Sequence, residues 1–487
     1  MNTAKSDEEK FDVAIVGYGP VGATLAHLLG MSGLSVIVLE REGAAYHLPR
    51  AVQFDDEVMR VFQTIGLAEL IGAKTRVNTN VHFVDAAGKM LMDWPRPGGI
   101  GRHGWYGSYR FHQPELETIL RDGLARYPNV TVRTRCDVFM VEDRGDSVHL
   151  RYEDMTNGRI HRIGAAFVVG CDGARSLVRR FIETDMEDLG FHERWLVVDV
   201  LLKGEKPELG DHSVQHCDPA RPITYIRGTG NRRRWEITVH PDEDTARATT
   251  PEFVWNVLSR WVTPEEAEIE RATVYMFHSL IANDWRRGRL FVAGDAAHQT
   301  PPFLGQGMCA GIRDVANLSW KLERAVRDGD DTLLDSYQSE RIPHTREYIE
   351  TAVRLGWLIN TEGPEAALGA AEPGQDGAAT MVKVGPPLGP GLGNGPHAGQ
   401  IFGQPLLADG RRLDDAVGYA PCLVAEPSLL EAVALPEGLV AVSSADAPEV
   451  VAELERFGAA AVLVRPDRYV LGAANDAAGL SELVAAI

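Results

Sequence analysis

The hydrophobic positions of the chain predict an alternation of buried strands and helices. An apolar run from Phe11 to Val16 predicts a strand that ends in glycines, and a helix is expected from Pro20 to Met31. A second apolar run, from Leu34 to Leu39, predicts a second strand, and Glu40 follows it. The order strand, helix, strand is typical of a parallel βαβ unit. The chain is therefore expected to open with an α/β sheet.

The remaining pattern predicts a mixed middle part, a linker and a small C-terminal part. Residues 190 to 285 are rich in strand patterns, and an apolar strand from Arg289 to Ala293 precedes a helix with apolar positions three and four residues apart. Between Thr361 and Gln400, 16 of 40 residues are Gly or Pro and none is aromatic, which predicts a linker. Beyond it, the order of strands and helices fits an α/β domain of about 90 residues.

Composition narrows the classes of protein and of partner. The chain has 487 residues, which is enough for two or three domains, and its formal net charge of −20 disfavours binding to nucleic-acid phosphates. No apolar stretch approaches the roughly 20 residues of a membrane span, and no signal-peptide pattern is found, so a cytoplasmic location is expected. The five cysteines are widely spaced without a Cys-x-x-Cys pair, so neither a metal site nor a disulfide framework is expected.

The first glycine cluster carries the signature of a dinucleotide site. The loop between the first strand and the first helix consists of Gly17, Tyr18, Gly19, Pro20, Val21 and Gly22. Its G-x-G-x-x-G spacing lets the backbone approach a pyrophosphate, and the helix N-terminus presents N–H groups to it. Glu40 would accept hydrogen bonds from ribose hydroxyls and would repel a 2′-phosphate. The loop indicates an adenine dinucleotide but does not separate NAD from FAD.

Two later motifs separate these cofactors. Gly170 to Ser176, which contains Asp172 and Arg175, follows a predicted strand, and Gly294 to Gly307 follows the strand that ends at Ala293. Together with the glycine loop, these stretches resemble the three FAD motifs of the flavin-dependent aromatic hydroxylases, the group A monooxygenases. The order and approximate spacing are those of that family over roughly residues 10 to 350.

The resemblance implies FAD as cofactor, NADH or NADPH as a transient co-substrate, and O2. It implies that Asp295 bonds a ribityl hydroxyl, and that Pro301 and Pro302 stiffen the turn in front of the isoalloxazine ring. Further implied cofactor contacts are Arg41, Arg50, Gln113, Asp172, Arg175, Gly294, Gly305, Gln306, Gly307 and Met308. His298 and Cys309 are interpreted as local packing residues rather than catalytic groups.

The implied fold is α/β, with three domains. They are a FAD-binding Rossmann-like domain of the glutathione-reductase type, a mixed-sheet α+β substrate domain, and a C-terminal thioredoxin-like domain without redox cysteines. The expected boundaries are 1–80, 100–185 and 286–360 for the FAD-binding domain, 81–99 and 186–285 for the substrate domain, 361–395 for the linker and 396–487 for the C-terminal domain.

Within the family, the sequence is most similar to the 3-(3-hydroxyphenyl)propionate hydroxylases. The similarity rests on His216 to Pro222, Arg232 to Glu236 and Arg465 to Val470, whereas Gln299 to Phe303 is nearer to the phenol and polyketide hydroxylases. It implies hydroxylation of a phenolic ring through a flavin C4a-hydroperoxide. Candidate substrate contacts are His216, Tyr225, Arg227 and Trp235, with Arg221 or Arg227 meeting a carboxylate.

Two alternatives stay open at this point. The chain could hydroxylate a polyketide or another aromatic secondary metabolite, or it could be a flavoprotein reductase or dehydrogenase that inserts no oxygen. A homodimer is also left open.

Overall fold

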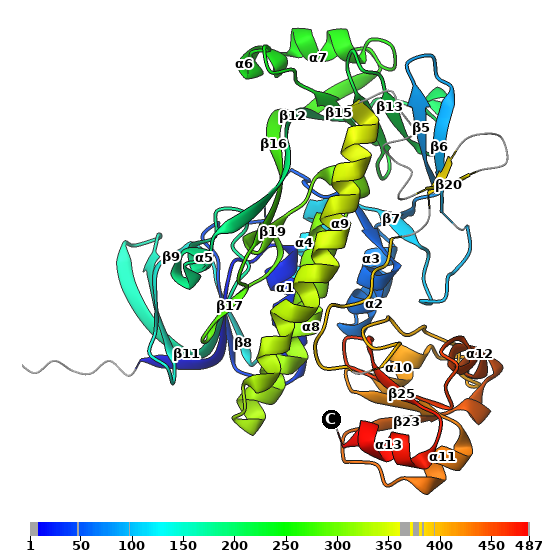
Figure 1. Ribbon diagram of the computed structural model, residues 1–487. Helices are drawn as coiled ribbons and strands as arrows, with labels where there is room; N and C mark the ends of the chain where they lie inside the picture. The colour runs from blue at the N-terminus through cyan, green and yellow to red at the C-terminus, as the bar shows by residue number, and fades with distance from the viewer. Residues whose placement is uncertain are drawn as a thin grey trace, which may run out of the picture.

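The computed structural model describes residues 8–45, 48–96, 98–360, 371–373, 379–381, 384–393 and 395–485. Within these ranges the strands form sheets of eight, ten, four and three strands. In Figure 1 the eight-stranded sheet lies at the lower left, the ten-stranded sheet at the top and the four-stranded sheet at the lower right. The long helices α8 (Gly307–Asp328) and α9 (Ser336–Asn360) run through the middle of the molecule.

The eight-stranded sheet, here called the dinucleotide sheet, contains the predicted βαβ unit. β1 (Glu9–Val16) pairs in parallel with β2 (Val36–Leu39) and β11 (Arg159–Gly170), and α1 (Pro20–Met31) connects β1 to β2. β11 also pairs in parallel with β18 (Leu290–Val292). Parallel strands end at the same edge of a sheet, so the loops that follow these strands meet there. This edge carries all three of the motifs found in the sequence.

The other elements of this part have the following bounds. They are β8 (Val130–Arg133), β9 (Cys136–Asp143), β10 (Val148–Asp154), β17 (Arg286–Arg287), α4 (Gln113–Gly123) and α5 (Leu177–Ile182). A three-stranded connecting sheet is formed by β3 (Gln53–Asp55), β7 (Ser108–Arg110) and β4 (Arg76–Val77), followed or flanked by α2 (Asp56–Thr64) and α3 (Ala68–Gly72).

The ten-stranded sheet, here called the large sheet, runs in the order β19-β16-β12-β15-β14-β13-β5-β6-β21-β20. Its longest strands, β12 (Met186–Leu202) and β16 (Ala267–Ala282), are antiparallel. The others are β5 (Asn80–Asp85), β6 (Met90–Pro95), β13 (Ser213–Cys217), β14 (Ile223–Arg227), β15 (Arg232–Thr238), β19 (His298–Gln299), β20 (Ala371–Pro373) and β21 (Ala379–Met381).

Alternation along the strands gives the large sheet two different faces. Val198 and Ile237 belong to the face that packs against α7 (Pro251–Leu258), here called the far face. Trp195 belongs to the opposite face, here called the near face, and it packs with Phe303 and residues of α9. The near face is therefore the one that meets the Gly294 to Gly307 motif.

The stretch expected to be a linker, 361–395, is not without secondary structure. β20 and β21 lie within it and pair with one another, and β21 pairs with β6 at Met92 and Asp93. Gly and Pro are disfavoured inside central strands but are tolerated at an edge, where half of the backbone groups need no partner. The other predicted elements lie within a few residues of their expected bounds.

The C-terminal part forms the four-stranded sheet β23-β22-β24-β25. Its elements are β22 (Cys422–Ala425), β23 (Val440–Ser443), β24 (Ala461–Val464), β25 (Val470–Ala474), α10 (Leu413–Val417), α11 (Pro427–Ala432), α12 (Pro448–Arg456) and α13 (Ala477–Val484).

Buried ion pairs join the C-terminal part to the rest of the chain. Arg60 of α2 donates to Asp414 at 2.8 and 2.9 Å. Arg465 donates to Glu340 of α9 at 2.8 and 2.9 Å, and Lys321 of α8 donates to the same carboxylate at 2.8 Å. Each of these side chains is at most 3 % exposed. Charges so deeply buried need their partners, so this contact is specific rather than incidental.

Among the described residues, none of the helices combines the length and apolar character of a membrane span. The same residues contain no group of three or more His, Cys, Asp or Glu side chains placed to hold a metal ion.

Candidate active site

The glycine loop after β1 is shaped by close backbone packing on one side and open space on the other. Gly17 has φ +104°, and a Cβ there would lie 2.4 Å from the carbonyl oxygen of Cys171. A Cβ on Gly22 would lie 2.1 Å from the carbonyl oxygen of Gly17, whereas one on Gly19 would meet nothing within 4 Å. Glycine is thus required at the first and third positions of the loop by packing within the protein. At the second position, a ligand can approach the backbone without obstruction.

The N-terminus of α1 is open to a ligand. Pro20 stands in its first turn, Gly19 is its N-cap, and no side chain caps it. Unsatisfied N–H groups and the positive end of the helix dipole favour an anion at such a position. Glu40, at the end of β2, accepts hydrogen bonds from the backbone N–H of Tyr18 and of Glu42, each at 2.7 Å. It therefore borders the loop, as expected, and also holds its backbone.

Arg41 and Gln113 lie in different surroundings. The Arg41 side chain is 67 % exposed and stands 3.9 Å from the Glu42 carboxylate. Gln113 begins α4 and is buried; its carbonyl oxygen accepts from the N–H of Arg50 at 2.9 Å and of Ala51 at 2.7 Å. The Gln113 amide thus fixes the backbone beside Arg50. Arg50 itself is exposed; burial raises the pKa of Glu117 and of Asp295, and the charge of Arg50 opposes this rise in both, so Arg50 lies near both carboxyls.

The Asp172 motif is built around a helix start. Asp172 accepts from the N–H of Leu177 at 2.7 Å and of Val178 at 3.3 Å, at the first turn of α5. Arg175 is exposed and forms no hydrogen bond or ion pair with any residue in the described ranges. Arg179, which the sequence did not single out, donates to the carbonyl oxygens of Ala296 at 2.7 Å and Ala174 at 2.8 Å. Its side chain connects this motif to the Gly294 motif, in addition to the backbone hydrogen bond from Ala293 to Gly170.

Asp295 projects from the loop after β18. It is exposed and has no hydrogen bond to any residue that the structure describes. The surrounding protein nevertheless raises the pKa of its carboxyl by desolvation, while His298 and Arg50 lower it. Gly294 before it has φ +61°, a backbone conformation that favours glycine. A hydrogen-bond acceptor without a partner at the edge where the three motifs meet fits the hydroxyl group of a ligand.

His298 and Cys309 are packing residues, which confirms their interpretation from the sequence. His298 is fully buried, and its Nε2 lies 2.7 Å from the Oδ2 of Asp314, which also accepts from the N–H of Gly294 at 3.0 Å. Cys309 is fully buried, and burial raises the pKa of its thiol far above the ordinary value. A thiol of this kind is not a nucleophile at neutral pH.

The Pro301 to Gly307 segment forms a compact turn that ends at a second open helix N-terminus. Pro302 to Leu304 form a single 3₁₀ turn, and Gly305 follows with φ +64°. Gln306 is the N-cap of α8, but its side chain does not cap the helix. Gly307 begins α8, and a Cβ on it would meet nothing closer than 3.9 Å. Met308 is half-buried.

A chain of contacts fixes Gln306 and reaches the C-terminal part. Its amide donates to Asp55 at 3.1 Å and accepts from Arg313 at 2.9 Å. Arg313 also donates to Glu57 at 2.6 Å, and the Tyr469 hydroxyl donates to the same carboxylate. Arg313 was not foreseen, because a buried arginine inside an apolar helix pattern has no distinctive spacing.

The four residues expected to contact substrate are not brought to this turn. Tyr225 and Trp235 are at most 2 % exposed, lie 5.2 Å apart by ring centroids and belong to the far face. The His216 ring lies against Trp261 of the same face, with ring centroids 5.3 Å apart and the planes tilted by 58°, and burial lowers the pKa of His216 to about 4. Arg227 shares that face with Tyr225, two residues before it, and donates to the carbonyl oxygens of Gly228 and Gly230. Strand alternation directs all four away from the near face.

Arg221 is also committed elsewhere. It forms a two-bonded pair with Glu243 at 2.6 and 3.0 Å and donates to the carbonyl oxygen of Thr238. The sequence pattern could not assign the two faces of the large sheet, because Arg232 to Glu236 carries large residues at every position.

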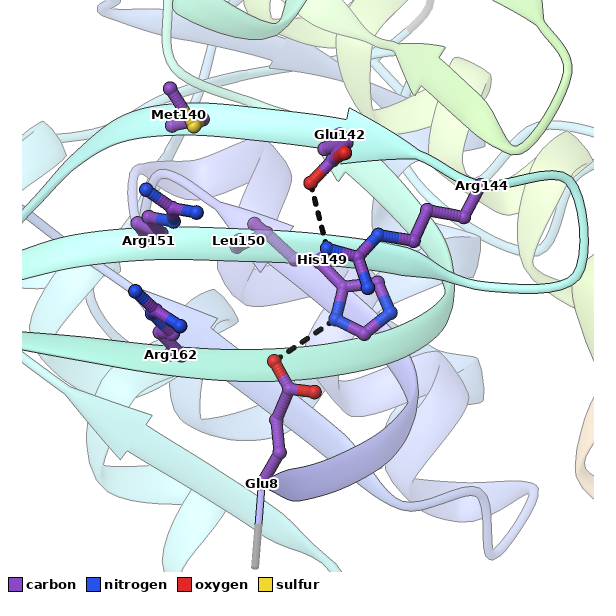
Figure 2. Close-up of a pocket in the computed structure, with 8 residues that line it drawn as sticks. All are labelled: Glu8, Met140, Glu142, Arg144, His149, Leu150, Arg151 and Arg162. Atoms are coloured by element: carbon purple, nitrogen blue, oxygen red, sulfur yellow. Dashed lines mark hydrogen bonds and ion pairs between the residues drawn. The ribbon is translucent and has the colours of Figure 1, made fainter. Parts of the chain in front are cut away.

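A separate hollow lies on the dinucleotide sheet, away from the motif edge. Figure 2 shows its lining residues, which are Glu8, Met140, Glu142, Arg144, His149, Leu150, Arg151 and Arg162. Glu8 precedes β1 whereas the glycine loop follows it, so the strand's rise separates the two by about 26 Å. Glu142 pairs with Arg144 at 2.9 Å and Glu8 with His149 at 3.0 Å, so its carboxylates are locally compensated.

The arrangement at the motif edge fits a flavin dinucleotide. It has two uncapped helix N-termini, a glycine cradle that a Cβ would fill, and an acceptor, Asp295, without a partner. In comparison with known proteins, the family model described as "FAD binding domain" matches residues 10–352. The chain is also 38% identical, over 98% of its length and 95% of the relative's, to a "Probable NADH-specific resorcinol 4-hydroxylase" of Rhodococcus jostii. The chain belongs to the family of FAD-dependent aromatic hydroxylases.

Other relatives of this hydroxylase carry a different substrate in their names. A "3-(3-hydroxy-phenyl)propionate/3-hydroxycinnamic acid hydroxylase" of Burkholderia cenocepacia is 34% identical over 99% of the chain and 97% of the relative. The enzyme of the same name from Mycobacterium sp. (strain JLS) is 39% identical over 73% of the chain, but the match spans only 61% of that relative.

Solved structures agree with the fold. The flavin-dependent monooxygenase PieE in complex with FAD and substrate has a TM-score of 0.83 at 20% identity, covering 98% of both chains. Aklavinone-11 hydroxylase with FAD and aklavinone has a TM-score of 0.80 at 22% identity, covering 98% of this chain and 99% of that one. The hydroxylase described here therefore has the mixed α/β architecture of these enzymes.

Proposed function

We propose that this FAD-dependent hydroxylase inserts one oxygen atom of O2 into a phenolic ring at the expense of NADH. The observation that carries the proposal is the meeting of the Pro301 to Gly307 turn with the near face of the large sheet. Phe303 of the turn packs edge-on against Trp195, with ring centroids 5.5 Å apart. The Phe277 side chain packs in the same apolar cluster. An apolar wall beside the cofactor suits an aromatic ring and excludes water.

The cofactor would lie along the motif edge from the glycine loop to the turn. The adenosine and pyrophosphate end would be held by Gly17, Gly19, Pro20, Val21, Gly22 and Glu40. The central part of the cofactor would be held by Arg50, Gln113, Asp172, Gly294 and Asp295. The isoalloxazine end would be held by Pro301, Pro302, Gly305, Gln306, Gly307 and Met308. When bound and reduced, FAD supplies the activation of dioxygen. The positive end of α8 would stabilise negative charge on the pyrimidine edge, and the Gln306–Arg313 contact would keep that helix start in place.

NADH is proposed as the electron donor because one of the relatives that match over nearly the whole chain is named as NADH-specific. We also propose that the C-terminal part is thioredoxin-like in fold and has no redox role. Its sequence contains only one cysteine, Cys422, and burial raises the pKa of that thiol to about 12.

The test measures oxygen insertion directly. Purified holoenzyme is incubated with NADH under labelled dioxygen and either resorcinol or 3-(3-hydroxyphenyl)propionate, and products are analysed by mass spectrometry. The expected product gains one labelled oxygen. NADH oxidation that yields only hydrogen peroxide, with every phenol offered, would contradict the proposal and favour a reductase. Exchange of NADH for NADPH tests the choice of donor in the same assay.

A further inference from the structure

A buried arginine, Arg110, stands between the turn and the large sheet, and the half-buried Arg96 lies near it. Arg110 of β7 is directly opposite Gln53 of β3, so their side chains share one face of the connecting sheet. Gln53 donates to the carbonyl oxygen of Leu304 at 3.3 Å, and a Cβ on Gly305 would lie 3.2 Å from Gln53. That face of the connecting sheet therefore abuts the turn.

Arg110 also reaches the near face of the large sheet. Its Nη2 donates to the hydroxyl of Ser213 at 2.9 Å. Ser213 alternates with Val214, which packs on the far face, so the Ser213 side chain points to the near face. The Arg110 guanidinium is thus held in the layer where the aromatic ring is proposed to bind.

The positive charges of Arg110 and Arg96 have no carboxylate in direct contact, although Glu236 acts on Arg110, and Asp55 and Asp56 act on Arg96, to raise their pKa values. Arg110 is 5 % exposed, its Nε has no hydrogen-bond partner, and neither it nor Arg96 forms an ion pair with any described residue. Arg96 lies 3.7 Å above the Trp94 ring, and its Nε also has no partner. Burial and the neighbouring Arg96 lower the pKa of Arg110 to about 9, and burial lowers that of Arg96 to about 10.

The carboxylates that act on these two arginines, Asp55, Asp56 and Glu236, each lie closer to another group. Asp55 pairs with Arg313, and Asp56 lies 3.1 Å from His103. On the near face, Asp199 pairs with both Arg234 and Arg271, and Glu236 lies 3.8 Å from Arg234. A buried arginine without a counter-ion is costly, and a ligand carboxylate would supply two acceptors in the geometry of the guanidinium fork.

We infer that Arg110 and Arg96 bind an anionic substituent, a carboxylate, on the aromatic substrate and so set the position of its ring against the Pro301 to Gly307 turn. The inference rests on the proposed function and narrows it: a phenol with an acidic side chain is preferred to a neutral phenol such as resorcinol. It replaces Arg221 and Arg227, which the sequence suggested for this role.

The test compares two ligands that differ only in charge. Holoenzyme is titrated with 3-(3-hydroxyphenyl)propionate and with its primary amide, and binding is followed by the perturbation of flavin absorbance. Wild type is expected to bind the acid at least about 10-fold more tightly. Arg110→Met should weaken binding of the acid by about 10- to 100-fold, as for loss of a hydrogen bond to a charged group, and change that of the amide by less than about 3-fold.

Two further variants keep the test decisive. Arg110→Lys should recover part of the preference for the acid, and Arg227→Met, on the far face of the large sheet, should leave it unchanged. If Arg110→Met does not retain flavin, the inference is tested by Arg96→Gln and by the ratio of the wild-type affinities for the acid and the amide. Equal affinity for acid and amide, or tighter binding of resorcinol than of the acid, would overturn the inference. If a phenol is nevertheless hydroxylated, the proposed function still stands. If no phenol perturbs the flavin or is hydroxylated, both fall.

Discussion

Replacing Glu340 with Gln should loosen the contact between the C-terminal part and the rest of the enzyme. Glu340 is 1 % exposed and accepts from Asn317 and Lys321 at 2.8 Å, from Arg465 at 2.8 and 2.9 Å, and from the N–H of Leu392 at 3.0 Å. Glutamine keeps the shape of the side chain but removes its charge. The buried cations Lys321 and Arg465 would then share only the remaining carboxylate of Asp467.

The magnitude follows from the burial of these groups. Breaking a buried pair by removing one partner destabilises a protein by about 3–5 kcal/mol, because the other charge stays buried. At the lower limit of about 3 kcal/mol, the melting temperature of the unit that contains the contact should fall by roughly 6–12 °C. Glu187→Gln is the matched control. Glu187 pairs with Arg346, which lies on α9 as Glu340 does, but the Glu187 side chain is 43% exposed. Exposed pairs contribute only about 0–1 kcal/mol.

The assay follows thermal unfolding of both variants by circular dichroism and by release of flavin fluorescence, at neutral pH. Limited proteolysis reports separately whether the C-terminal part has come loose. If Glu340→Gln melts within the range of Glu187→Gln, the buried cluster does not hold the two parts together and the reasoning is refuted.

The pH dependence gives the same prediction a second measurement. Burial alone would raise the pKa of Glu340, but Arg465 and Lys321 together lower it well below its ordinary value of 4.5. A carboxyl with a lowered folded-state pKa stabilises the protein fully above its unfolded-state pKa, and that stability is lost as the pH falls towards the folded-state pKa. The difference in melting temperature between wild type and Glu340→Gln should therefore be full at neutral pH and should shrink as the pH falls below about 4.5.

Three other changes test the cofactor site. Asp295→Ala should lower the affinity for FAD by about 10-fold, since one hydrogen bond to a carboxylate is lost; unchanged flavin content after dialysis would show that this carboxylate does not hold the cofactor. Gly17→Ala should abolish flavin binding or prevent folding, because its Cβ would lie 2.4 Å from the Cys171 carbonyl oxygen. Gly19→Ala should fold and weaken only flavin binding. Thermal melts with and without FAD measure both effects. Tyr469→Phe should speed flavin release by about 5-fold, because it weakens the contacts from Glu57 through Arg313 to Gln306. Tyr419→Phe is the control: it removes a hydroxyl bonded to Ser319, which lies on α8 as Arg313 does, and should not change the release rate. Equal release rates for the two variants would refute the connection.

The sequence was a good guide to the motif edge because its signals are local. Gly17, Gly22, Gly294 and Gly305 are dictated by backbone conformation or by close packing over a few residues, and such requirements leave a fixed spacing. The strands and helices around them have a clear apolar periodicity. The edge strands β20 and β21 were missed, because their pairing with β6 depends on a distant segment and leaves no mark in a Gly- and Pro-rich stretch.

The substrate side was less predictable, for a physical reason. The face to which a strand residue points depends on register, and a shift of one residue exchanges the faces. Trp235 and Tyr225 look like substrate contacts as residue types, but register assigns them to the core beneath α7. Arg110 lies outside the main strand-rich region, and only the tertiary fold brings it beside Ser213, with Arg96 near it.

The turn proposed to face the flavin ring is connected by hydrogen bonds to a different sheet from the loop proposed to hold the adenosine end of the cofactor. β19 leads directly into the turn and pairs with Leu280 and Ile281 of β16, so it is the last strand of the large sheet. The glycine loop belongs to the dinucleotide sheet. A cofactor held at both ends would span the boundary between these two separate sheets, here called the two bodies, and act as a cross-link between them. Its loss should let those bodies move relative to one another, and any tilt of the large sheet on binding substrate would be passed to the ring through β19.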